Sequence, residues 1–197
     1  MDPASAIGSV LAAFGLSGAA GLNAWLPLFA GALLDRLGVV DLGAPFGDLS
    51  TTPALVVLGV LLAADEVGDK IPAVDHVLHA AGTVVHPLAG AALFAGQAGV
   101  HLPTWVSIAA GALVAGSLHA GRATIRPAST AATGGAGNPL LSLTEDAASA
   151  VLTALAFLVP LLAFAAVAGL LVLMALGVRR VRRLAARRSR SSPPRAG

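Results

Sequence analysis

The residues best suited to chemistry begin with an acidic run that interrupts the apolar sequence. Asp65 and Asp69 are four residues apart, and Asp75 and His79 repeat that spacing, so each pair would share one face of a helix. Carboxylate oxygens are ligands for hard cations such as Mg²⁺, and an imidazole adds affinity for Mn²⁺ or Zn²⁺. We therefore predict a divalent-cation site formed by Asp65, Asp69, Asp75 and His79, and no other cofactor.

The same acidic run allows two other interpretations. It holds four carboxylates and Lys70, with His86 shortly after them, and intramembrane Asp and His residues are typical of proton relays. Alternatively, the run is a solvated loop in which Lys70 pairs with Asp69 or Glu66. The sequence leaves these interpretations open, because the flanking apolar segments are too short to span a membrane unless the acidic run itself enters it.

A second polar block extends from His119 to Asp146. Its glycines, just before Asn138, would leave backbone N–H groups free to bind an anionic group such as phosphate or a lipid head. The sequence favours a simpler structure, a flexible loop ending in a helix with Asn138 as N-cap and Pro139 in the first turn. The polar residues of this block that we assign to a ligand pathway are Arg122, Arg126, Ser129, Thr130, Asn138, Glu145 and Asp146.

This block ends with two acidic residues, and the sequence allows two explanations for their position. Glu145 and Asp146 could start the last long helix, where carboxylates complement the positive end of the helix dipole. They could instead pair with Arg122 or Arg126 inside the bundle, which is the usual arrangement for buried charges in lipid.

An isolated polar residue, Asn23, lies in the first apolar segment beside a glycine-rich run. Its default role is a hydrogen bond across helices, and its position at a break in the helix also permits a role in lining a pore. With the acidic run, the first part of the chain contributes to the predicted ion or substrate pathway Asn23, Asp65, Asp69, Lys70 and Asp75.

The amino-acid composition indicates that these residues belong to an integral membrane protein. Of 197 residues, 56% are hydrophobic and 11% are charged, whereas soluble domains carry about 25% charged residues. The apolar residues are mainly small or aliphatic, which lets helix backbones approach closely in lipid. Cysteine is absent, which excludes disulfides and thiolate metal sites. These features predict an all-α, multi-pass transmembrane helical bundle.

The apolar segments predict about four to six crossings with short or broken helices. They comprise residues 4–34, 53–64, 87–100, 103–118 and 147–178. The first is too long for one span and predicts two helices, and the last is interrupted by Pro160, which predicts a kinked helix or a helical pair. The two short segments beside polar blocks are typical of broken helices at membrane depth. A basic residue shortly before a proline occurs at both Lys70 and Arg126, which suggests a weak internal repeat.

The basic residues are distributed unevenly, with eight of the twelve in the last nineteen positions. A basic cluster directly after a long apolar segment is a positive-inside signal. We therefore predict a transmembrane domain of residues 1–178 and a basic, disordered cytoplasmic tail of residues 179–197. The tail is expected to contact anionic lipid heads rather than nucleic acid, although Arg-rich segments also bind phosphate backbones. A homo-oligomer is expected where one copy is too small to enclose a path.

Three motifs carry a resemblance to a known family: Gly21-Leu-Asn23 followed by Pro27, Asp69-Lys70-Ile-Pro72 followed by Asp75, and the run from Ser129-Thr130 through Thr133-Gly-Gly-x-Gly-Asn138-Pro139 to Glu145-Asp146. With these motifs the chain resembles a bacterial membrane family known as a domain of unknown function, number 4126, over nearly all its length up to Val178. The resemblance implies a helical fold in the bacterial cytoplasmic membrane and implies no reaction.

The leading functional hypothesis is a small transporter or channel for an ion or small polar solute, because polar blocks adjoin short apolar helices. One alternative is an intramembrane enzyme acting on a lipid or phosphate ester. His79 or His86 would then act with Asp75 as acid and base, and Arg122 and Arg126 would hold the phosphate. The absence of a recognised catalytic signature favours a protein that is not an enzyme. The other alternative is a non-catalytic protein that organises membrane partners.

Overall fold

The computed structural model describes residues 3–68, 72–99, 101–134 and 137–191, without the side chains of residues 72–77, 79, 128 and 184–191. Throughout these residues the regular secondary structure is helical, because a backbone in lipid has to satisfy its own hydrogen bonds. The helices are α1 (Pro3–Leu22), α2 (Trp25–Arg36), α3 (Phe46–Leu49), α4 (Thr52–Gly68), α5 (Pro72–Ala98), α6 (Thr104–Thr133), α7 (Asn138–Leu158) and α8 (Pro160–Ser191). The predicted all-α bundle is confirmed.

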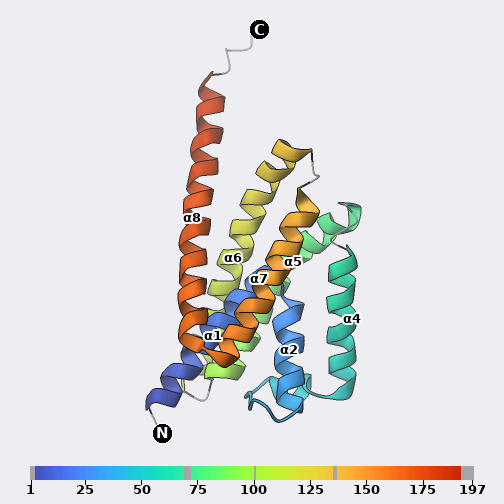
Figure 1. The fold of residues 1–197 in the computed structure, drawn as a ribbon, viewed down its shortest axis with the longest axis vertical. Coiled ribbons are helices and arrows are strands. Elements are labelled where there is room, and N and C mark those ends of the chain that lie inside the picture. The colour runs from blue at the N-terminus through green and yellow to red at the C-terminus, as the bar shows by residue number, and fades with distance from the viewer. Residues whose placement is uncertain (1–2, 69–71, 100, 135–136, 192–197) are drawn as a thin grey trace.

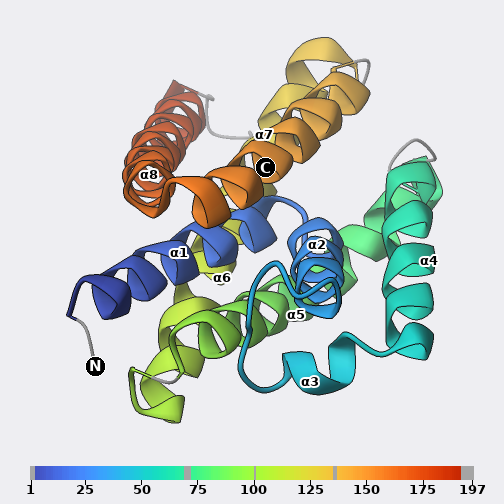
Figure 2. The same ribbon diagram turned by 60° about the horizontal axis from the view of Figure 1, so that its bottom comes forward.

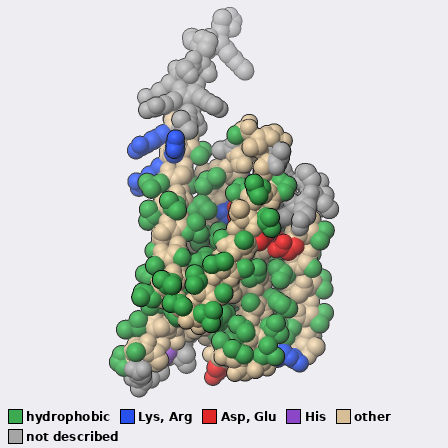
Figure 3. All heavy atoms as spheres, viewed as in Figure 1, with side chains coloured by type: hydrophobic (Ala, Val, Ile, Leu, Met, Phe, Trp, Pro, Cys, Tyr) green, Lys and Arg blue, Asp and Glu red, His purple; other side chains and the backbone are tan. Residues whose placement is uncertain are grey.

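Four of the described helices are long and apolar enough to cross a membrane: α1, α6, α7 and the Pro160–Arg183 part of α8. Only 11% of the apolar window of α8 is buried within the protein, so most of its side chains need lipid as their surroundings. Figure 3 shows hydrophobic side chains over most of the visible outer face. The chain is therefore an integral membrane protein.

The first apolar segment forms two helices, as predicted, with the break at Asn23 and Ala24. Figure 1 shows α1 rising from the N-terminal end of the bundle, and α2 returning from the break to that same end. In Figure 2, α1 runs between the α5–α6 pair and the α7–α8 pair, and it packs against all four of these helices. The break consequently lies inside the bundle, where its polar backbone is covered by protein.

Two prolines lie inside helices, although the sequence suggested a segment beginning at Pro87 and a loop around Pro127. The short segment expected at residues 87–100 is part of α5, which continues through Pro87, and α6 continues through Pro127 to Thr133. The prediction of a flexible loop after residue 118 was therefore wrong, since only residues 134–137 separate α6 from α7. In lipid a kinked helix leaves fewer backbone groups unsatisfied than a loop does. The two sites of the suggested repeat also differ, because Pro72 begins a helix and Pro127 does not.

The last apolar segment forms a helical pair that turns at Val159 and Pro160, one of the two predicted arrangements. Past residue 178 the structure differs from the prediction, because α8 continues without interruption to Ser191. The part of the basic tail that the structure describes is thus helical rather than disordered, since arginine and alanine have high helix propensities. Figure 1 shows this extension rising beyond the rest of the bundle, away from the N-terminus.

Glycines allow a close helix contact between α5 and α6. A Cβ atom on Gly111 would lie 2.7 Å from the Cβ atom of Phe94, and one on Gly90 would lie 2.6 Å from the carbonyl oxygen of Gly111. We predict that Gly111→Ala lowers the free energy of unfolding by about 1–3 kcal/mol through overpacking, measured by denaturant unfolding in detergent micelles. Gly169→Ala is the control, because nothing lies within 4 Å of a Cβ atom there. Equal stability of the two variants would contradict the prediction.

Candidate functional site

The side-chain amide of Asn23 joins three helices at the break between α1 and α2. Its Oδ1 accepts hydrogen bonds from the backbone N–H groups of Trp25 and Leu26, both at 3.0 Å, and thereby caps the start of α2. This fixes the orientation of the amide, so its Nδ2 group must point the other way. Nδ2 donates to Oδ1 of Asp146 on α7 at 2.9 Å and to Oε1 of Glu66 on α4 at 3.3 Å. We call Asn23, Glu66 and Asp146 the amide bridge.

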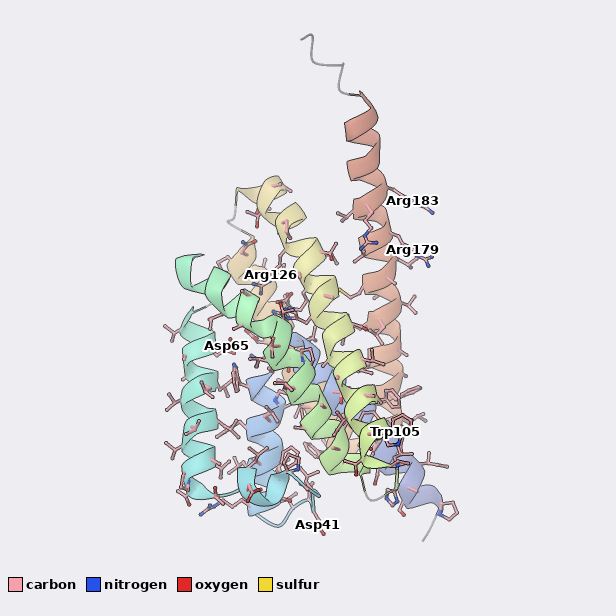
Figure 4. The ribbon with its side chains drawn as sticks, turned by 180° about the vertical axis from the view of Figure 1, so that it is seen from behind. Asp41, Asp65, Trp105, Arg126, Arg179 and Arg183 are labelled. Carbon is pink, nitrogen blue, oxygen red and sulfur yellow. The ribbon has the colours of Figure 1, made fainter. Side chains whose placement is uncertain are left out.

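The carboxylates of the amide bridge and the neighbouring Asp65 are partly enclosed by the bundle. Glu66, Asp146 and Asp65 are half-buried, whereas Asn23 is buried. Figure 3 shows acidic side chains between α7 and α4, surrounded by hydrophobic ones. In Figure 4, Asp65 lies at a level between Trp105 and Arg179. The positive end of α2 points into this region and stabilises negative charge there.

A buried ion-pair cluster adjoins the amide bridge. The Nη2 atoms of Arg122 and Arg126 lie 2.6 Å and 2.8 Å from Oε2 of Glu145. The three residues are 6%, 9% and 7% exposed. Of the two explanations for Glu145 offered by the sequence, pairing inside the bundle is the one observed. Glu145 is not in the first turn of α7, because that helix begins at Asn138.

The second guanidinium nitrogen of Arg122 binds the end of α1. Nη1 donates to the carbonyl oxygen of Leu22 and, at 3.4 Å, to that of Gly21. These are among the last carbonyl groups of α1, which have no partner within the helix. Nη1 also lies 3.2 Å from Nε2 of His86 on α5. Arg122 therefore connects α6 to α1, α5 and α7 directly beside Asn23.

His86 forms a close pair with His119 on α6. Their ring centroids are 4.2 Å apart, and Nδ1 of His86 lies 3.0 Å from the carbonyl oxygen of Gly82. The pair needs a glycine, because a Cβ atom on Gly82 would lie 2.8 Å from Cε1 of His119. The sequence prediction omitted His119, Gly82 and Glu66 from the site. The only sequence signal for Glu66 was its place in the acidic run.

Three predicted pathway residues lie elsewhere, at the α6–α7 turn. Oγ1 of Thr130 and the amide of Asn138 hydrogen-bond to each other at 3.1 Å and 3.3 Å, and Ser129 accepts a bond from Thr133 through its carbonyl oxygen. Asn138 does not cap α7 through its side chain, contrary to prediction, because that side chain bonds Thr130. Arg122 and Arg126, from the same polar block, contact Glu145.

The predicted divalent-cation site falls largely outside the described residues. Asp69 and Lys70 are not described, and Asp75 and His79 lie on α5 without described side chains. Asp65 is on α4 beside Glu66. Within the described part of the chain, no group of three or more His, Cys, Asp or Glu residues is arranged to hold a metal ion. The four-residue cation site therefore stays a prediction.

Comparison with known proteins identifies the family. The model of a domain of unknown function, DUF4126, matches residues 10–180. The chain belongs to the DUF4126 family. No curated protein and no solved structure matches the chain. The matched range contains the whole amide bridge, the ion-pair cluster and the histidine pair, so this site belongs to the DUF4126 domain itself.

Proposed function

We propose that this DUF4126 protein is a small transporter or channel that moves a cation across the membrane through the amide bridge. The observation that carries the proposal is the convergence of Glu66 and Asp146, from two helices, on the amide at the α1–α2 break. Broken helices at membrane depth are where many transporters bind their ions, and intramembrane carboxylates commonly mark ion pathways.

A cation is favoured over an anion by the charges around the site. The two polar blocks carry six carboxylates and three Lys or Arg residues: Asp65, Glu66, Asp69, Asp75, Glu145 and Asp146 against Lys70, Arg122 and Arg126. Both arginines of the site contact Glu145, and Arg122 also holds backbone carbonyl groups. An anion would have to displace these contacts, whereas the half-buried carboxylates offer oxygen ligands to a proton or a small metal ion.

The same proposal includes an orientation in the bacterial cytoplasmic membrane. Arg179, Arg180, Arg182 and Arg183 follow the apolar part of α8, and Figure 4 shows Arg179 and Arg183 near one end of the bundle. By the positive-inside rule this end faces the cytoplasm, where anionic lipid heads would bind the arginines. Asp41, labelled at the opposite end in Figure 4, would face outward.

We predict that Asp146→Asn combined with Glu66→Gln lowers cation flux at least tenfold, because both carboxylate ligands at the amide bridge lose their charge. The measurement is ion flux into proteoliposomes, with Na⁺, K⁺, Mg²⁺, Mn²⁺ and protons tested separately. Both substitutions keep side-chain shape, so the fold should tolerate them better than truncation.

The matched control is Asp41→Asn, which removes an exposed carboxylate outside the site and should leave flux unchanged. Flux equal to that of the unmodified protein in the double variant would refute a transport role for the amide bridge. Absence of flux with every cation in the unmodified protein would refute the cation proposal for these ions.

A further inference from the structure

The contact between His86 and Arg122 requires an unprotonated ring nitrogen. A guanidinium is always charged and only donates hydrogen bonds, so Nε2 of His86, 3.2 Å from Nη1 of Arg122, must be the acceptor. The other ring nitrogen, 3.0 Å from the carbonyl oxygen of Gly82, then carries the proton and donates. This hydrogen-bond pattern assigns His86 the neutral form.

A second proton on His86 would disrupt the contact of its ring with Nη1 of Arg122. Nε2 would then present an N–H group to the N–H group of Nη1, and two cations would face each other. Nη1 also holds the carbonyl oxygen of Leu22, whereas Nη2 is held separately by Glu145 at 2.6 Å. Displacing Nη1 would therefore free the end of α1, directly before Asn23, while the contact with Glu145 serves as the pivot.

We propose that His86 is a proton-binding site whose protonation withdraws Arg122 from the α1–α2 break and so rearranges the amide bridge. The coupling of this proton to cation movement rests on the function proposed above. The proton site itself does not, because the contacts from His86 through Arg122 to Leu22 exist whatever passes through the membrane.

The surroundings of His86 support a site for one proton. Its charged or titratable neighbours include His119 and Arg122 on α6, with Glu145 on α7 behind Arg122. Two imidazolium rings with centroids 4.2 Å apart would repel each other. Gly82 makes this close arrangement possible, because a Cβ atom there would lie 3.0 Å from the His86 ring.

Tryptophan fluorescence offers a direct test of this proton site. The chain has two tryptophans, so Trp105→Phe leaves Trp25 alone, and the backbone N–H of Trp25 donates to Asn23 at the break. Acidifying this variant in lipid nanodiscs from about pH 8 to about pH 5, the range of histidine switches, should shift the Trp25 emission reversibly. His86→Gln should abolish the shift, because glutamine can accept from Arg122 without titrating.

The control is His119→Gln, which removes the neighbouring imidazole and should retain the shift. His86→Asn serves as a second variant, and the emission of every variant at pH 8 must match that of the parent to show that the break is intact. A shift that persists in both His86 variants, or no shift in the parent, would overturn the proposal. A fluorescence shift in a protein that shows no cation flux would refute the transport function and support the proton site. Cation flux without a fluorescence shift would support the transport function and refute the proton site.

Discussion

Glu145→Gln is expected to lower the free energy of unfolding by about 3–5 kcal/mol, because it leaves two buried guanidinium groups without their shared carboxylate. Glu145 lies within 2.8 Å of both Arg122 and Arg126, and all three residues are at most 9% exposed. Because these side chains are buried, little solvent screening would compensate for the loss. The measurement is equilibrium unfolding in mixed detergent micelles.

A double variant tests the cause of that loss. In the Glu145→Gln background, Arg126→Gln removes one of the two charges that have lost Glu145, so it should recover part of the stability instead of adding to the damage. Asp41→Asn is the matched single-carboxylate control and should change stability by less than about 0.5 kcal/mol, as expected for an exposed residue. Additive losses in the double variant would show that the ion pairs do not govern stability here.

Asn23→Leu is expected to have the second largest effect, a loss of about 3 kcal/mol in unfolding free energy. Leucine has the same number and branching of side-chain heavy atoms, but it removes the cap of α2, worth about 1 kcal/mol, and both hydrogen bonds to Glu66 and Asp146. Cation flux in proteoliposomes should fall with it, because the carboxylates lose the amide that holds them together.

Asn23→Ser separates the two contributions. A serine oxygen can still cap α2, but it cannot reach both carboxylates, so stability should recover by about 1 kcal/mol relative to leucine while flux stays low. Unfolding curves and flux assays on the same preparations check this. Full flux in Asn23→Ser would mean that the amide donors are not needed at the proposed ion site.

Local sequence features accounted for several elements of the fold. The glycine-rich run before Asn23 predicted the break between α1 and α2, and Pro160 predicted either a kink or a helical pair, of which the pair is observed, because glycine and proline act on their own segment of backbone. The same reasoning was wrong at Pro87 and Pro127, which lie inside helices. Neighbouring helices pack against α5 and α6, and the environment within lipid favours continued helix over the loop that proline would allow in water.

The candidate site, too, was predicted only in part from the sequence. Residue types and low charge content by themselves determined that this is a multi-pass helical membrane protein. They also singled out the polar residues that are exceptional in such a protein: Asn23, Asp65, Arg122, Arg126, Glu145 and Asp146. For Glu145 the sequence left two explanations open. Spacing along one helix cannot report contacts between helices far apart in the chain. Only the tertiary structure showed that Asn23 joins Glu66 to Asp146, and that Arg122 links Glu145, His86 and the end of α1. These contacts depend on which faces of α1, α4, α6 and α7 pack against one another, and the packing of the helices determines those faces.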